Sequence, residues 1–194
     1  MDCDSVIAVI ARDMDYYRQS GGGVTFSGGE ALAHKDAVTY MLKECKRLGI
    51  HTAVETCGNI AAGTVAEVLP LTDLFLFDLK HTDAERVREV TGGDPDLILG
   101  NLRDICSANP GKVTLRMPCI PGFNMEQEHF RTAFDMAREF GIADIDLLPY
   151  HALGTGKYHE MGKEYRFSGG STDRRWLEGL ASEGRNKGLK INIL

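Results

Sequence analysis

The sequence lacks closely spaced cysteines. Its five cysteines are scattered along the chain, at Cys3, Cys45, Cys57, Cys106 and Cys119. Zinc ribbons, C-x-x-C redox motifs and cysteine runs that bind iron–sulfur clusters all need closer pairs, so we expect none of them within this chain. The odd number of cysteines also argues against a secreted scaffold held together by disulfides.

Long hydrophobic runs and an excess of basic residues are absent too. No stretch approaches the length of a membrane span, and the acidic start Met1-Asp2-Cys3-Asp4 is unlike a secretory signal. With 22 basic and 28 acidic residues the net charge is −6, whereas proteins that bind nucleic acid normally present a basic face. We therefore expect no membrane partner, no nucleic acid partner and a cytoplasmic location.

The chain has the length and composition of one globular domain. It has 194 residues, of which 43% are hydrophobic and 26% are charged. Apolar residues at helical spacing predict five helices, over 4–18, 35–48, from Asp94-Pro95 onward, over 125–140 and near 172–187. For the last of these helices, Ser171 or Thr172 is the expected N-cap.

Short apolar runs between these helices predict strands at 24–26, 51–54, 74–77, 113–117, 145–148 and 191–194. Strands that alternate with helices form βα units, which build a parallel sheet. Six strands are too few for the closed eight-stranded barrel, which typically has about 250 residues. The fold class is therefore α/β, as either a doubly wound sheet or a partial barrel.

Polar residues or glycines follow five of the predicted strands, where parallel α/β proteins bind their ligands. They lie at 27–30, 55–58, 78–80, 116–122 and 149–151. Any one of them is consistent with an ordinary turn. Their coincidence at one edge of the sheet favours a single polar site.

The glycine-rich segment 21–30 is not a phosphate-binding loop. From Gly23 it reads G-x-x-x-x-G, but Gly29 and Glu30 stand where a P-loop has lysine and serine or threonine. Backbone carbonyls with a carboxylate suit a cation such as an ammonium group. The alternative is that the glycines only allow tight turns around the strand.

Other side chains at the strand ends have two interpretations each. Asp78 and Lys80 point to the same side and form either a surface ion pair or part of a site. Arg116 is expected either to bind a ligand carboxylate or to pair with a neighbouring acid. Of the six histidines, His151 is the best site candidate, and we expect the others, His34, His51, His81, His129 and His159, at the surface or in caps. Cys57 and Cys119 are expected to be buried, inert thiols.

The sequence resembles the radical S-adenosylmethionine family, and specifically the glycyl-radical enzyme activases. The resemblance runs from about residue 5 to 194 and rests on SGGGVTFSGGEAL at 20–32, Glu55-Thr56, Asp78-Leu79-Lys80, Arg116 with the Pro-Gly that follows, and LLPYH at 147–151. It also includes Thr91-Gly92 and the segment 153–167. It implies a partial (βα)6 TIM-like barrel of the radical SAM type, with the active site at the carboxyl ends of the strands. Residues 1–194 would form a single truncated barrel domain that lacks its first strand.

The resemblance also implies roles for individual residues. Gly28, Gly29 and Glu30 would bind the methionyl ammonium of S-adenosylmethionine, Glu55 and Thr56 would lie near the sulfonium, Asp78 and Lys80 would line the cofactor or peptide site, Arg116 would approach the ribose or carboxylate, and His151 the adenosyl group. Glu55, Thr56 and Asp78 could hold a monovalent cation. The implied reaction is reductive cleavage of S-adenosylmethionine to a 5′-deoxyadenosyl radical, which removes a Cα hydrogen from a glycine of pyruvate formate-lyase or a relative. Reduced flavodoxin or ferredoxin would donate the electron.

Two departures from the family pattern matter. Glu55 and Cys57 stand where many members have Asp and Asn, which puts the cation site in doubt. The C-x-x-x-C-x-x-C loop that binds the family's [4Fe–4S] cluster is absent, so we expect the C-terminal portion of an activase, inactive alone and without a cluster. The alternative is a cluster-less protein of the same fold that binds S-adenosylmethionine or a peptide. An unrelated α/β lyase or aldolase would explain neither SGGE nor LLPYH.

Overall fold

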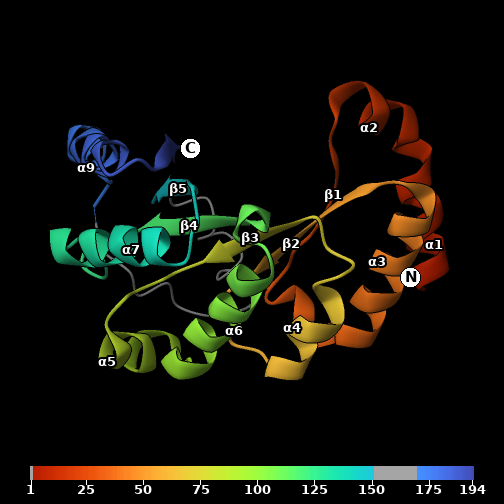
Figure 1. Ribbon diagram of the computed structural model, residues 1–194, viewed down its shortest axis with the longest axis horizontal. Helices are drawn as coiled ribbons and strands as arrows, with labels where there is room; N and C mark the ends of the chain where they lie inside the picture. Colours follow the sequence, from red (N-terminus) through yellow and green to blue (C-terminus); the bar gives the residue numbers. More distant parts are fainter. Residues whose placement is uncertain (1, 151–169) are drawn as a thin grey trace.

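Six parallel strands form one sheet in which the strands lie side by side in chain order (Figure 1). The computed structural model describes residues 2–150 and 170–194. The strands are β1 (Gly23–Phe26), β2 (His51–Thr56), β3 (Leu74–Asp78), β4 (Val113–Cys119), β5 (Asp144–Pro149) and β6 (Lys190–Ile193). All six strand predictions are confirmed, and so is the α/β class with a parallel sheet.

Eight α-helices are present in the described residues: α1 (Cys3–Ile10), α2 (Met14–Ser20), α3 (Lys35–Leu48), α4 (Ala62–Val68), α5 (Ala84–Arg86), α6 (Pro95–Ala108), α7 (Gln127–Glu139) and α9 (Arg174–Asn186). The helix predicted over 4–18 is divided into α1 and α2 by a 3-10 turn at Ala11–Asp13. The short helices α4 and α5 were not predicted. The predicted cap of α9 was also wrong, because Asp173 accepts the capping hydrogen bond, from the backbone N of Arg175 at 2.9 Å.

The helices follow one another along the sheet. Because consecutive strands are neighbours and βα crossovers are right-handed, each connecting helix is carried to the same face of the sheet. Contacts link α1 to α3, α3 to α4, α4 to α6, and α7 to α9. Figure 1 shows α3, α4 and α6 in succession and α7 with α9 at the other end of the sheet.

The two faces of the sheet have different characters. Along β4, Val113, Leu115, Met117 and Cys119 are at most 2% exposed and belong to the main core cluster. Between them, Thr114, Arg116 and Pro118 are only half-buried and point to the opposite face. One face of the sheet thus packs against the helices, and the other carries the polar side chains.

The sheet is open within the part of the chain that the structure describes. There β1 pairs with β2 alone and β6 with β5 alone, so the strands do not close into a barrel. This agrees with the predicted partial barrel. None of the helices among residues 2–150 and 170–194 is long and apolar enough to span a bilayer.

Candidate functional site

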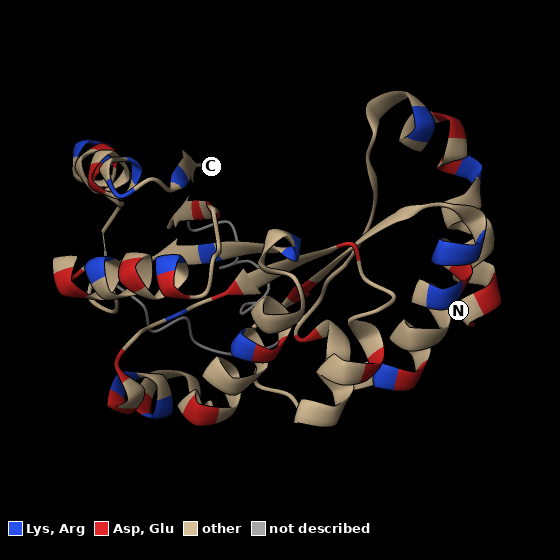
Figure 2. Cartoon of the chain, in the orientation of Figure 1, with Lys and Arg blue, Asp and Glu red and all other residues tan. Residues whose placement is uncertain are grey.

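Polar side chains from the ends of four neighbouring strands, three of them charged, meet at the carboxyl-end edge of the sheet. Figure 2 shows both signs of charge on the strands as well as on the outer helices. Asp78 on β3 and Arg116 on β4 are partners in the strand register, so their side chains point to the same face. Glu55 on β2 and Ser27, just after β1, continue this row of polar groups. The sequence prediction that the strand ends share one polar edge is therefore consistent with the geometry.

Arg116 lies between two carboxylates. Its Nη1 is 2.7 Å from Glu55 Oε1, and its Nε is 3.6 Å from Asp78 Oδ1. Ser27 Oγ donates a hydrogen bond of 2.6 Å to the other oxygen of Glu55. Lys80 Nζ lies 3.8 Å from Asp78 Oδ2. Of the two interpretations of Arg116, the structure shows the pairing with neighbouring acids.

Asp78 has the most buried charged side chain in this row, at 17% exposed. Burial raises the pKa of its carboxyl, while the nearby cations Lys80 and Arg116 oppose that rise. Its Oδ1 atom is buried and accepts no hydrogen bond from any described residue. A desolvated carboxylate with an unused acceptor is suited to a ligand that brings a positive charge and N–H donors.

The carboxylate of Glu30 links two segments of the backbone at the site by hydrogen bonds. Its Oε2 accepts hydrogen bonds from Thr56 Oγ1 (3.0 Å) and from the backbone N of Cys57 (2.9 Å), and its Oε1 accepts one from the backbone N of Leu32 (3.2 Å). The carboxylate thus ties the segment after β1 to the end of β2. The direct binding of an ammonium group by Glu30 stays a prediction.

Gly28 and Gly29, before Glu30, present bare backbone. Gly28 has φ +143°, a backbone conformation that residues with a side chain rarely adopt. Both glycines are exposed. A Cβ atom at either position would meet nothing within 4 Å. The backbone at both positions is therefore exposed.

The three residues predicted to hold a monovalent cation do not converge. Because successive side chains of β2 alternate, Glu55 and Thr56 point to opposite faces of the sheet. Thr56 Oγ1 contacts Glu30, and the space between Glu55 and Asp78 is taken by the guanidinium of Arg116. Among the described residues no group of three or more His, Cys, Asp or Glu side chains could hold a metal ion.

The predictions for the histidines have mixed outcomes. His151 and His159 lie outside the described residues. His34 and His51 are exposed, as expected. The surface prediction was wrong for His81 and His129, which are 8% and 2% exposed and stack with ring centroids 4.6 Å apart. They are buried because α7 covers the loop after β3. His81 Nδ1 accepts a hydrogen bond from the backbone N of Asp83, and His129 Nδ1 accepts one from the backbone N of Thr82.

The cysteines offer no ligand set for an iron–sulfur cluster. All five are free, and they lie on different elements of the fold. Cys119 is fully buried, and burial raises its pKa to about 12, in agreement with an inert thiol. Cys57 is only half-buried at the end of β2, with Sγ 3.3 Å from Glu30 Oε2. A [4Fe–4S] cluster does not fit the described part of this chain, so we derive no chemistry through it.

Two polar residues of the same face were not found from the sequence. Asp146 on β5 is the register partner of Arg116, and Asn192 on β6 donates a 2.8 Å hydrogen bond to Asp146 Oδ1. The strict alternation Asp144-Ile145-Asp146-Leu147 carried the signal, because a period of two marks a strand with one polar face. The apolar run 145–148 alone predicts the strand but not these polar positions.

Comparisons with known proteins point to one family. The model of the Radical SAM superfamily matches residues 5–134. The choline trimethylamine-lyase activating enzyme of Oleidesulfovibrio alaskensis is 40% identical over 168 residues, covering 84% of this chain and 54% of that protein. The 4-hydroxyphenylacetate decarboxylase activating enzyme of Clostridioides difficile is 37% identical over 179 residues, covering 91% of this chain and 56% of that protein. The chain spans about half the length of these curated relatives.

Two solved structures share the fold. A domain of the pyruvate-formate lyase-activating enzyme from Bacteroides vulgatus has a TM-score of 0.74 and 28% identity, covering 89% of this chain and 99% of that chain. Streptococcus suis SuiB bound to S-adenosylmethionine has a TM-score of 0.70 and 17% identity, covering all of this chain (100%) and 41% of that one. At that identity the second likeness concerns the fold alone.

Proposed function

This chain belongs to the radical SAM superfamily, and on that premise we propose that it is the S-adenosylmethionine-binding part of an enzyme that activates a glycyl-radical enzyme. The observation that carries the proposal is the row of charges at the strand ends, where Arg116 lies between Glu55 and Asp78. The names of the relatives, which are activating enzymes for several different lyases and a decarboxylase, support it.

The row fits the two charges of an amino-acid group. The methionyl end of S-adenosylmethionine carries a carboxylate and an ammonium. Lys80 and the guanidinium of Arg116 supply donors for the carboxylate, and Arg116 would exchange part of its contact with Glu55 for the ligand. The unused Oδ1 of Asp78 and the backbone oxygens of the exposed Gly28 and Gly29 would accept from the ammonium.

The remaining assignments rest on the family resemblance. His151 would contact the adenosyl group, and Thr56 would lie near the sulfonium. Glu55 and Asp78 would hold a monovalent cation after Arg116 moves, without the side chain of Thr56, which points to the other face of the sheet. When bound, S-adenosylmethionine would supply the adenosyl carbon that takes up the glycine Cα hydrogen. The partner would be pyruvate formate-lyase or a relative, with reduced flavodoxin or ferredoxin as the electron donor, in the cytoplasm.

Calorimetry with the purified chain tests the proposal. We expect S-adenosylmethionine to bind weakly and the Arg116→Gln and Asp78→Asn variants to bind it about tenfold more weakly, which is about 1.4 kcal/mol each. Arg131→Gln is the matched control, because Arg131 on α7 pairs with Glu183 on α9 at 2.6 Å and no residue of the row takes part in that pair. Equal affinity of all four proteins, or no binding to any, would contradict the proposal.

A second function is favoured by the absence of cluster ligands among the described residues. It is a cluster-less protein that retains the same row of charges to hold S-adenosylmethionine or a peptide. Tight binding of S-adenosylmethionine by the iron-free chain, in the low micromolar range, would favour this function. An activase would bind it weakly when no cluster is there to coordinate the methionyl group.

A further inference from the structure

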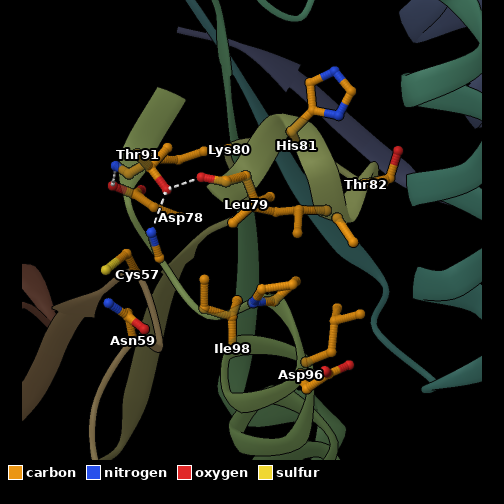
Figure 3. Close-up of a pocket in the computed structure, with 15 residues that line it drawn as sticks. Cys57, Asn59, Asp78, Leu79, Lys80, His81, Thr82, Thr91, Asp96 and Ile98 are labelled. Atoms are coloured by element: carbon orange, nitrogen blue, oxygen red, sulfur yellow. Dashed lines mark hydrogen bonds and ion pairs between the residues drawn. The ribbon is translucent and has the colours of Figure 1, made fainter. Parts of the chain in front are cut away.

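A pocket of about 170 Å³ opens directly beside the row of charges (Figure 3). It lies between the ends of β2 and β3 on one side and α5 and the start of α6 on the other. Figure 3 shows Cys57 and Asn59 on one side of the pocket and the Asp78–Lys80 pair nearby. Its apolar walls consist of Leu79, Ala84, Val87, Pro95, Ile98 and Leu99.

The pocket has the size and character of a side-chain binding site. A cavity of about 150 Å³ with apolar walls is large enough to bind benzene, so this pocket has room for one aromatic ring or a large aliphatic group. The charges of Asp78 and Lys80 lie 3.8 Å apart and compensate each other. An uncharged apolar group therefore fits this pocket better than an ion.

The walls of the pocket are held in place by hydrogen bonds between lining residues and by an ion pair next to it. Thr91 Oγ1 donates to the carbonyl of Val87 (2.7 Å) and accepts from the backbone N of Gly93 (3.1 Å). Arg86 on α5 pairs with Glu126, before α7, at 3.1 Å. Such ties favour a pocket that is formed before the ligand arrives, which lowers the entropy cost of binding.

We propose that this pocket receives a large apolar side chain, the size of phenylalanine or leucine, from the peptide segment that carries the target glycine. The inference rests on the proposed function, and names the class of substrate segment. Cys57, Asp78 and Lys80 belong to the pocket and also to the strand-end site, so a ligand seated in one lies against the other. In an extended peptide, neighbouring residues are about 3.3 Å apart, so a side chain next to the glycine can enter the pocket while the glycine faces the row of charges.

Two peptides that differ in one side chain test this inference. The probes are acetyl-Ala-Gly-Phe-Ala-amide and acetyl-Ala-Gly-Ala-Ala-amide, titrated into the chain with affinity measured by NMR. We expect the phenylalanine peptide to bind about tenfold more tightly, which is about 1.4 kcal/mol. The largest chemical-shift changes should occur at the backbone amides of residues 79–99. Equal affinity of the two peptides, or no binding of either, would overturn the assignment.

Variants then test whether the preference arises in this pocket. Ala84 is exposed and lines it, so Ala84→Phe should fill the space without disturbing the core and abolish the preference. Ile98→Ala enlarges the pocket and should lower the affinity for the phenylalanine peptide severalfold. Leu71→Phe is the control for added bulk, since Leu71 is partly buried before β3 and outside the pocket. A preference that survives Ala84→Phe would place the binding elsewhere and overturn the inference.

Titration of S-adenosylmethionine into the same samples separates the two proposals. If it binds while the peptides are not distinguished, the pocket assignment fails alone. If it does not bind while the phenylalanine preference follows the pocket variants, the proposed function fails and the peptide pocket stands.

Discussion

Arg116 Nη1 on β4 lies 2.7 Å from Glu55 Oε1 on β2, across the strand β3 that separates them. Because the same guanidinium also lies within ion-pair distance of Asp78 on β3, one cation links three neighbouring strands at their carboxyl ends. The side chains of Arg116 and Glu55 are 20% and 27% exposed, so water screens this pair only in part.

A double-mutant cycle of Glu55→Gln and Arg116→Met should therefore give a coupling free energy of about 1–2 kcal/mol. Urea denaturation of the four proteins measures it. The control cycle uses Arg131 and Glu183, a more exposed pair on α7 and α9, where we expect a clearly smaller coupling free energy because water screens the pair. Equal coupling in the two cycles would show that the Glu55–Arg116 pair behaves as an ordinary surface pair.

Glu30 should matter for stability as well as for the site. Its carboxylate accepts hydrogen bonds from Leu32, Thr56 and Cys57, so Glu30→Ala leaves these donors unpaired and should lower the free energy of unfolding by about 2–3 kcal/mol. Glu30→Gln keeps one acceptor oxygen and should cost about half as much. Urea denaturation checks both values, and equal losses for the two variants would contradict the acceptor role.

The strands could be predicted well because each is a short apolar run bounded by glycine or polar residues. The helix over 4–18 was harder, since its apolar stripe continues through Ala11–Asp13 although the backbone tightens there into a 3-10 turn. The helix α5 has only three residues and offers no periodicity to detect.

The site was predictable in position but not in its pairings. Parallel strands bring their carboxyl ends together, so Glu55, Asp78 and Arg116 could be placed at one edge from the sequence. Which carboxylate Arg116 would contact depends on side-chain reach across β3, and the burial of His129 depends on how α7 packs over the loop after β3. Neither follows from local sequence, because both join segments far apart in the chain.

Gly58, just after β2, should not tolerate a side chain. It has φ +74°, and a Cβ atom there would overlap Cζ of Phe77, which is fully buried. We expect Gly58→Ala to lower the free energy of unfolding by about 3 kcal/mol, from backbone strain of about 1–2 kcal/mol and from the overlap.

Gly49 provides the matched control for this change, since its φ is +71° and a Cβ atom there would meet nothing within 4 Å. Gly49→Ala should cost only the backbone strain, about 1 kcal/mol. Thermal or urea denaturation compares the two. If both variants lose the same free energy of unfolding, the side chain of Phe77 moves aside without destabilising the fold.

The buried His129 should make the stability of the fold depend on pH. Burial, with a smaller effect of the neighbouring His81, lowers the pKa of His129 from 6.5 to about 3. Above pH 6.5 the imidazole is neutral in both folded and unfolded chains. Below it the unfolded chain takes up a proton that the folded chain excludes, so the free energy of unfolding should fall by up to about 1.4 kcal/mol per pH unit.

Urea denaturation between about pH 7 and pH 5 isolates this effect, because most carboxylates remain charged in that range. His129→Asn removes the titrating ring and keeps an acceptor for the backbone N of Thr82, which donates to Nδ1 at 3.1 Å. This variant should lose stability less steeply with falling pH than the unaltered chain. His34→Asn, at an exposed position, should leave the slope unchanged. The same slope in all three proteins would mean that His129 takes up its proton as readily in the folded chain as in the unfolded one.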